Sequence, residues 1–198
     1  MDFNDKNILN IYNYGSSVYN CKGINSDNDY IVIVSDGSEY PEQLKIYNND
    51  YSFYKESEFR ELIRQYEISA LECLLLDPKF IVKETVEFDF KLDLQQLRES
   101  ISQKSSNSFV KAKKKLIIEK DYDPYIGKKS LFHSLRIILF GIQIAKYSKI
   151  INYEIANIYY NDIVENEMVE WNFYKEKYQP IYNNLKTEFR KLAEKKRD

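Results

Sequence analysis

The chain has 198 residues, of which 43% are apolar and 30% charged, and its formal net charge is −2. This composition is typical of a folded protein and excludes collagen-like, disulfide-scaffold and largely disordered chains. Two cysteines and one histidine argue against a cysteine framework and a histidine-rich metal site. No apolar run is long enough to span a bilayer, and the first residues lack the pattern of a signal peptide. We therefore expect a cytoplasmic protein with no membrane partner.

The charge is unevenly distributed along the chain. Residues 1–97 hold 9 basic and 18 acidic residues, whereas residues 98–136 hold 10 basic and 4 acidic residues. An acidic half beside a basic segment suits a site that binds both a metal ion and phosphate groups. The alternative interpretation is that the acidic and basic segments only attract each other within the molecule.

The first ninety residues combine strand and helix patterns. Three strands are predicted at residues 8–14, 30–34 and 44–54, the last with a turn or bulge at residues 48–50. The run at residues 30–34 is apolar at every position, which predicts a strand buried on both faces. Two short helices are predicted, one opening with Ser57 as its N-cap and one at residues 69–76.

From about Leu92 onward the apolar spacing is helical. Helical segments are predicted within residues 92–118 and at residues 128–147, 153–164 and 168–196, with a loop at residues 121–127. The fold class is therefore α+β. Residues 1–90 would form a small mixed β-sheet with flanking helices, and residues 91–198 a helical part packed on it.

The stretch with the clearest chemical signal runs from Gly15 to the buried strand. Asp27 and Asp29 stand two residues apart at the strand entrance, so their side chains project from the same face. Two close carboxylates repel unless a divalent cation lies between them, and Mg²⁺ prefers carboxylates completed by substrate phosphates. The turn at Gly15, Ser16 and Ser17 supplies backbone N–H groups and hydroxyls that suit phosphate oxygens. Each motif alone is weak, because both occur often in ordinary loops.

The combination resembles the DNA polymerase β-like nucleotidyltransferase superfamily. That family's pattern is an apolar strand, Gly-Ser, a short helix, and then Ser-Asp-x-Asp opening the next strand. Gly15 and Ser16 match its first motif, and Ser26, Asp27 and Asp29 match its second. Family members usually carry a second glycine five residues after the first, where this chain has Asn20, so the loop is slightly remodelled.

The resemblance extends to a less characterised branch, the RlaP-like nucleotidyltransferases, which occurs in phages and bacteria and is associated by context with RNA repair. Matching stretches lie at residues 68–73, 111–115 and 122–136, and the similarity covers about residues 8–165. The spacing of Lys129, His133 and Arg136 on one helix belongs to this branch.

The resemblance implies transfer of NMP from an NTP to an acceptor hydroxyl, with release of pyrophosphate. It implies Mg²⁺ or Mn²⁺ held by Asp27 and Asp29 and by a third carboxylate on a following strand. Asp50 stands where that strand should run, although an aspartate in a turn is an equal alternative for it. Glu72 is the reserve candidate, and its helical position favours a structural or substrate-contact role.

Four further residues are candidates for nucleotide binding. Lys129, His133 and Arg136 lie on the side of their helix opposite an apolar stripe, and Lys111 opens a lysine run. Together they suit triphosphate oxygens. The alternatives are a satisfied core histidine beside paired cations and, for the lysine run, a solvated helix face or a patch for an RNA backbone.

The acceptor could be an RNA end, a protein or a small molecule. The basic segment at residues 98–136 favours RNA, for example tRNA. Two other functions compete with catalysis. A non-catalytic nucleotide- or RNA-binding module is favoured by the missing second glycine and the open third carboxylate. The second competing function is that of a nucleotidyltransferase-like member of a toxin–antitoxin pair.

Overall fold

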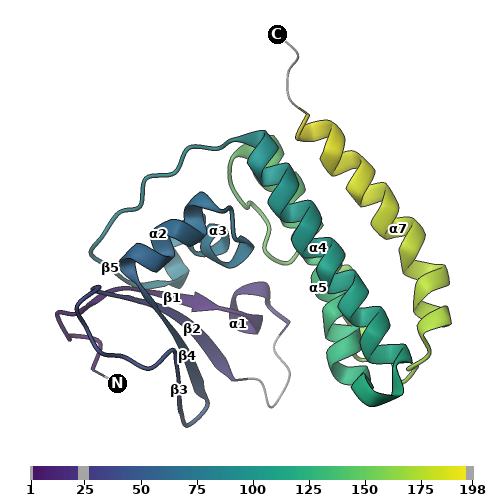
Figure 1. Cartoon of the computed structure of the whole chain (residues 1–198), viewed down its shortest axis with the longest axis horizontal. Helices are drawn as coiled ribbons and strands as arrows, with labels where there is room; N and C mark the ends of the chain where they lie inside the picture. The colour runs from purple at the N-terminus through teal and green to yellow at the C-terminus, as the bar shows by residue number, and fades with distance from the viewer. Residues whose placement is uncertain (1, 22–26, 195–198) are drawn as a thin grey trace. The chain divides into compact units, whose positions relative to one another are not determined.

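The computed structural model describes residues 2–21 and 27–194, and Ser26 lies outside them (Figure 1). The chain divides into two compact units, residues 1–91 and residues 92–198. The first unit is built around a β-sheet and the second consists of helices, so the predicted α+β class is confirmed.

Within the described residues, the first unit holds a sheet of five strands in the order β3-β4-β2-β1-β5. The strands are β1 (Ile8–Tyr14), β2 (Asn28–Val34), β3 (Gln43–Ile46), β4 (Asn49–Lys55) and β5 (Ile81–Glu84). Strands β2 and β4 run parallel, and the other neighbours are antiparallel. The sheet is therefore mixed.

Both faces of the sheet are covered with apolar side chains. Ile11, Val32 and Phe53 belong to the core on one face. On the other face, Tyr12 stacks on Phe59 of α2 (Glu56–Arg64), with ring centres 6.2 Å apart. That face is also shared by α3 (Ile68–Leu74), which contacts β1. Burial on both faces explains why the centre of β2 is apolar at every position.

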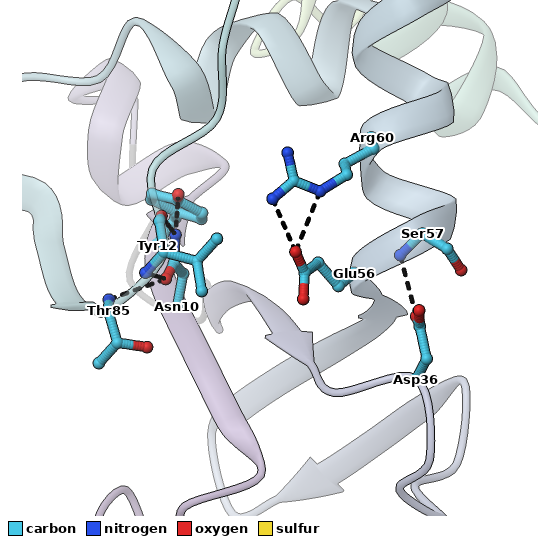
Figure 2. A network of polar contacts seen from close by, with 8 residues as sticks. Asn10, Tyr12, Asp36, Glu56, Ser57, Arg60 and Thr85 are labelled. Atoms are coloured by element: carbon cyan, nitrogen blue, oxygen red, sulfur yellow. Dashed lines mark hydrogen bonds and ion pairs between the residues drawn. The ribbon is translucent and has the colours of Figure 1, made fainter.

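A buried asparagine fastens the edge strand β5 to β1. The side-chain amide of Asn10 donates to the hydroxyl of Tyr12 at 2.7 Å and to the carbonyl of Val86 at 2.8 Å. Its carbonyl oxygen accepts the N–H groups of Thr85 and Val86, both at 3.0 Å. Figure 2 shows Asn10 between Tyr12 and Thr85. Every polar atom of this buried side chain is thus paired, as burial requires.

Helix α2 begins two residues earlier than the sequence predicts. Its N-cap is Lys55, whose backbone N–H donates to the Glu58 carboxylate at 3.0 Å, and Ser57 lies inside the first turn. The N–H of Ser57 donates instead to the Asp36 carboxylate at 2.9 Å (Figure 2). Asp36 lies in the turn after β2, so a residue distant in sequence takes the capping role expected of Ser57.

The predicted strand at residues 44–54 is a hairpin of two strands, β3 and β4. Tyr47 and Asn48 form its turn, and Tyr47 has a φ of 52°. The turn therefore comes earlier than residues 48–50, and Asp50 lies on strand β4. Strand β5 was not predicted, because its four residues are partly exposed and the last two, Lys83 and Glu84, are charged.

The second unit is built on three long helices that pack on one another: α4 (Leu94–Ile117), α5 (Pro124–Tyr147) and α7 (Trp171–Leu192). Phe109 of α4 stacks on Tyr182 of α7 at 4.5 Å between ring centres. Ser105 of α4 donates to the carbonyl of Ser134 on α5 at 2.8 Å. Aromatic packing and a buried hydroxyl therefore join the three helices.

Two boundaries in this unit differ from the prediction. Helix α5 starts at Pro124 rather than at residue 128, because the Asp123 carboxylate accepts the N–H of Ile126 at 3.0 Å and proline suits the first helical position. The prediction of one helix at residues 153–164 is wrong, because the structure has only a 3₁₀ turn at Asn157–Tyr159 and the short helix α6 (Tyr160–Ile163) there. Asparagine side chains favour turns over a continuous helix.

The last helix, α7, was predicted at residues 168–196 and spans Trp171–Leu192, and residues 195–198 lie outside the described part. No helix in the described ranges combines the length and the apolar character needed to cross a bilayer.

Candidate functional site

Four side chains form a row across one face of the sheet, at the end where β2 and β4 begin. Asp29 of β2 pairs with Tyr14 of β1 on one side and with Asp50 of β4 on the other. Asp50 pairs in turn with Lys45 of β3. Directly paired residues on neighbouring strands point to the same face. The parallel register of β2 and β4 therefore brings two of the predicted carboxylates side by side.

A lysine lies between two of the three predicted metal-binding carboxylates. The Nζ atom of Lys45 is 2.6 Å from Oδ2 of Asp27 and 3.5 Å from Oδ2 of Asp50. The hydrogen bond to Asp27 and the charges of both aspartates raise the pKa of Lys45 above its ordinary value. One cation thus interacts with both carboxylates, which shows that they converge on a common position.

Gly15 is packed against the carboxylate of Asp29. Its φ is +69° and its ψ is −148°, a conformation that residues with a side chain rarely adopt. A Cβ atom added to Gly15 would lie 2.0 Å from Oδ2 of Asp29. Only glycine therefore lets the chain turn at this point while Asp29 keeps its place.

The serines after Gly15 begin the short helix α1 (Ser16–Tyr19). Ser17 donates its hydroxyl hydrogen to the carbonyl of Tyr14 at 2.9 Å, which ties the turn to the end of β1. Within the described residues, the Ser16 hydroxyl makes no hydrogen bond, so it is available to a phosphate oxygen. Asn20 takes the left-handed conformation after α1, with φ 53°. Asparagine tolerates that conformation and so replaces the second glycine of the resembled family.

Glu72, the reserve for the third carboxylate, lies on α3 and is buried, with 1% of its surface exposed. Its carboxylate accepts a hydrogen bond from the hydroxyl of Tyr19 on α1. This contact joins α3 to the helix that follows the Gly-Ser turn. Glu72 therefore supports the helix after the turn through Tyr19, whereas Asp50 lies next to Asp29 in the sheet.

The carboxylates are suitable donors for a hard divalent cation, which prefers oxygen ligands. The ammonium group of Lys45 lies between the carboxylates of Asp27 and Asp50, where it would compete with a metal ion. Across residues 2–21 and 27–194, no three His, Cys, Asp or Glu side chains are gathered closely enough to hold a metal ion. One or two of these carboxylates fit Mg²⁺ or Mn²⁺ once Lys45 is displaced, and all three can share the ion only if they move closer together.

The second unit brings together the other four predicted residues. Arg136 and His133 lie on α5, and Nη2 of Arg136 is 2.8 Å from Nδ1 of His133. The charges of Lys129 on α5 and Lys111 on α4 also act on the His133 ring. We call these four residues the cationic cluster. Helical spacing aligns three of them, and the packing of α4 on α5 adds Lys111.

Burial lowers the pKa of His133 to about 3, and the charges of Arg136, Lys111 and Lys129 act in the same direction. The ring is therefore neutral near pH 7. Since the guanidinium can only donate, Nδ1 of His133 accepts the hydrogen bond from Arg136, which assigns the ring proton to Nε2. His133 thus orients Arg136 without adding a charge.

The low pKa of His133 predicts a stability change in mild acid. In the unfolded chain the ring takes up a proton near pH 6.5, whereas in the folded chain it does so only near pH 3. The stabilising contribution is complete above the unfolded pKa and falls by at most about 1.4 kcal/mol per pH unit below it. We expect His133→Asn to remove this dependence, measured by urea unfolding between about pH 7 and about pH 4. Equal slopes for wild type and variant would contradict the assignment.

Lys45 is the site residue that the sequence did not indicate. It stands on the strand β3, which the pattern merged with β4, and its pairing with Asp50 depends on the hairpin register. Recognition of a two-residue turn at Tyr47 and Asn48 would have placed it opposite Asp50.

A scan against protein-family models and a search of curated proteins each return no match. Among solved structures, the chain is similar to spectinomycin adenyltransferase AAD(9) from Enterococcus faecialis, solved with ATP and spectinomycin. The identity is 15%, the match covers 94% of this chain and 93% of the other, and the TM-score is 0.45. A nucleotidyltransferase-like protein from Exiguobacterium sibiricum 255-15 matches with 11% identity over 96% of this chain and 69% of the other, with a TM-score of 0.29. At these low values, a functional assignment rests on the chain's own residues.

Proposed function

We propose that the protein is a nucleotidyltransferase that moves NMP from an NTP to an acceptor hydroxyl and releases pyrophosphate. The favoured acceptor is an RNA end, such as that of a tRNA. The observation that carries this proposal is the pairing of Asp29 with Asp50, beside Gly15 and with Asp27 and Asp50 converging on one cation.

The carboxylates of the first unit have distinct roles in the proposal. Asp27, Asp29 and Asp50 would hold Mg²⁺ or Mn²⁺, which would neutralise charge on the triphosphate and activate the acceptor oxygen. Asp50 accepts the proton of the acceptor hydroxyl, whose oxygen bonds to the α-phosphorus of the NTP. The bond from the α-phosphorus to the bridging oxygen breaks, and pyrophosphate leaves with that oxygen.

The remaining predicted residues are assigned to phosphate binding, separately within each unit. The hydroxyl of Ser16 donates to a phosphate oxygen, and the absence of a side chain at Gly15 leaves the Asp29 carboxylate in position. In the second unit, Lys111, Lys129 and Arg136 supply positive charge. Arginine binds phosphate with two parallel donors, and the neutral His133 ring fixes its orientation.

The second candidate function is a nucleotide-binding module without catalysis. One observation favours it: within the described residues, the three carboxylates are not gathered closely enough to hold a metal ion. This candidate predicts nucleotide binding without release of pyrophosphate.

The proposed function is tested by incubating the protein with Mg²⁺, total RNA and each NTP labelled at the α-phosphate. We expect label to enter RNA, and a parallel reaction with γ-labelled NTP to label pyrophosphate alone. Label on a protein instead of RNA would contradict the RNA acceptor. Nucleotide binding with no transfer and no pyrophosphate would support the binding module.

Lys45 makes a prediction about metal affinity, since its ammonium group and a divalent cation compete for the same two carboxylates. We expect Lys45→Met to bind Mn²⁺ about fivefold more tightly than wild type, measured by the electron paramagnetic resonance signal of free Mn²⁺. Lys45→Arg retains the charge and serves as the control, with affinity near that of wild type. Weaker or equal binding by Lys45→Met would refute the competition.

A further inference from the structure

The corner where α4 ends and α5 begins exposes large apolar and aromatic side chains. Ile117 is 52% exposed, Tyr122 49% and Tyr125 58%. Tyr122 lies between the 3₁₀ turn Glu119–Asp121 and α5, and Tyr125 lies in the first turn of α5. Exposed apolar side chains that gather on one surface mark an interaction site more often than scattered ones do.

The same corner carries exposed lysines. Lys113 and Lys114 lie on the last turns of α4, and Lys120 lies in the 3₁₀ turn. None of the three makes an ion pair with any residue that the structure describes. Lys115 differs, because its Nζ atom lies 2.7 Å from Oδ1 of Asp121. Three positive charges of this corner are therefore available to an anionic partner.

Backbone contacts hold the corner in one shape. The N–H of Asp123 donates to the carbonyl of Lys115 at 2.9 Å, and the Asp123 carboxylate caps α5. Gly127 of α5 packs against Leu116 of α4 so closely that an added Cβ atom would lie 2.8 Å from its Cγ atom. The end of α4 and the start of α5, which carry these tyrosines and lysines, are thus held against each other.

The corner also adjoins the cationic cluster. The Nζ atom of Lys129 lies 5.1 Å from the ring centre of Tyr125, within the range of a cation–π contact. A ligand that lies across the tyrosines would therefore reach the residues assigned to the triphosphate.

We propose that this corner surface, formed by Lys113, Lys114, Ile117, Lys120, Tyr122 and Tyr125, binds single-stranded RNA. The lysines match the phosphate backbone in charge, and exposed aromatic rings are platforms on which unpaired bases stack. An acidic peptide would use the charges but not the ring faces. The choice of RNA rests on the proposed function. The corner surface would then hold the RNA strand whose end accepts the NMP.

The test measures RNA binding with transfer switched off. A fluorescent oligouridylate of about 12 nucleotides is titrated with the full-length protein in EDTA and without NTP, and its anisotropy is followed. We expect Tyr122→Ala/Tyr125→Ala to weaken binding about tenfold or more. Lys113→Gln/Lys114→Gln should reduce the slope of log affinity against log salt by about 1.4, because two phosphate contacts are lost.

The matched control is Tyr147→Ala/Lys149→Gln, which removes an exposed tyrosine and an exposed lysine near the C-terminal end of α5. Its RNA affinity should equal that of wild type, and circular dichroism should show all variants folded. Equal affinity of wild type and both corner variants would overturn the inference. Binding of wild type to phosphatidylserine vesicles but not to RNA would also overturn it.

Measurements of RNA binding and of NMP transfer distinguish the corner surface from the proposed catalysis. RNA binding that the corner variants lose, in a protein that transfers no NMP, would refute the proposed function and support the corner surface. Transfer into RNA by the corner variants with the KM of wild type would refute the corner surface and support the proposed function.

Discussion

Replacing Asp29 with asparagine is expected to lower the rate of NMP transfer by at least about a thousandfold. The substitution keeps the shape of the side chain and removes its charge. Asp29 stands beside Asp50 in the sheet register and against Gly15, so it joins the glycine turn to the second carboxylate of the site. An amide oxygen is a poorer ligand for a hard cation than a carboxylate and neutralises no charge.

The measurement is the initial rate of label transfer from an α-labelled NTP, beside the free energy of unfolding in urea. Asp29 is half-buried at the beginning of β2. We therefore expect the fold to survive the substitution. The control is Glu42→Gln, which removes one negative charge from an exposed position in the same unit. Transfer by Asp29→Asn at the rate of wild type would eliminate the proposed mechanism.

The second large effect is expected for Gly15→Ala. The added methyl group must occupy space now filled by the Asp29 carboxylate, whose Oδ2 atom would be 2.0 Å away. The backbone conformation, with φ +69° and ψ −148°, costs a residue with a side chain about 1–3 kcal/mol. We expect the variant to lose stability by about that amount and transfer activity by about a hundredfold or more.

Gly37→Ala is the matched control for this experiment. Gly37 lies in the turn after β2, and no atom comes within 4 Å of a Cβ atom added there. Its stability and transfer rate should therefore stay close to those of wild type. If Gly15→Ala lost stability but kept full activity, the position of the Asp29 carboxylate would not matter to the reaction.

Local patterns predicted much of the fold and part of the candidate site. The strand at residues 8–14 has the bounds of β1, and the apolar run at residues 30–34 lies within β2. The α5 helix was recognised from its apolar spacing, and that spacing also put Lys129, His133 and Arg136 on one side. These features depend on neighbours in the sequence, which is why a pattern can find them.

Long-range pairing decided what the patterns left open. Strand β5 is short and partly exposed, and it exists because β1 offers it an edge to pair with. Asp36 rather than Ser57 meets the first turn of α2, because the turn after β2 lies against that helix. A short edge strand or a distant cap leaves little trace in local apolar spacing.

By itself, the sequence determined the α+β class, the carboxylate pair Asp27 and Asp29, and the glycine turn that precedes them. Helical and strand periods bring together residues that are two to seven positions apart, so these features needed no tertiary information. Only the tertiary structure placed Asp50 beside Asp29 and Glu72 against Tyr19, because these positions depend on the register of β2 with β4 and on the packing of α3. It also placed Lys45 between two aspartates and brought the charge of Lys111 close enough to act on His133. These contacts join separate strands and helices, and chain packing, rather than local spacing, determines which of them form.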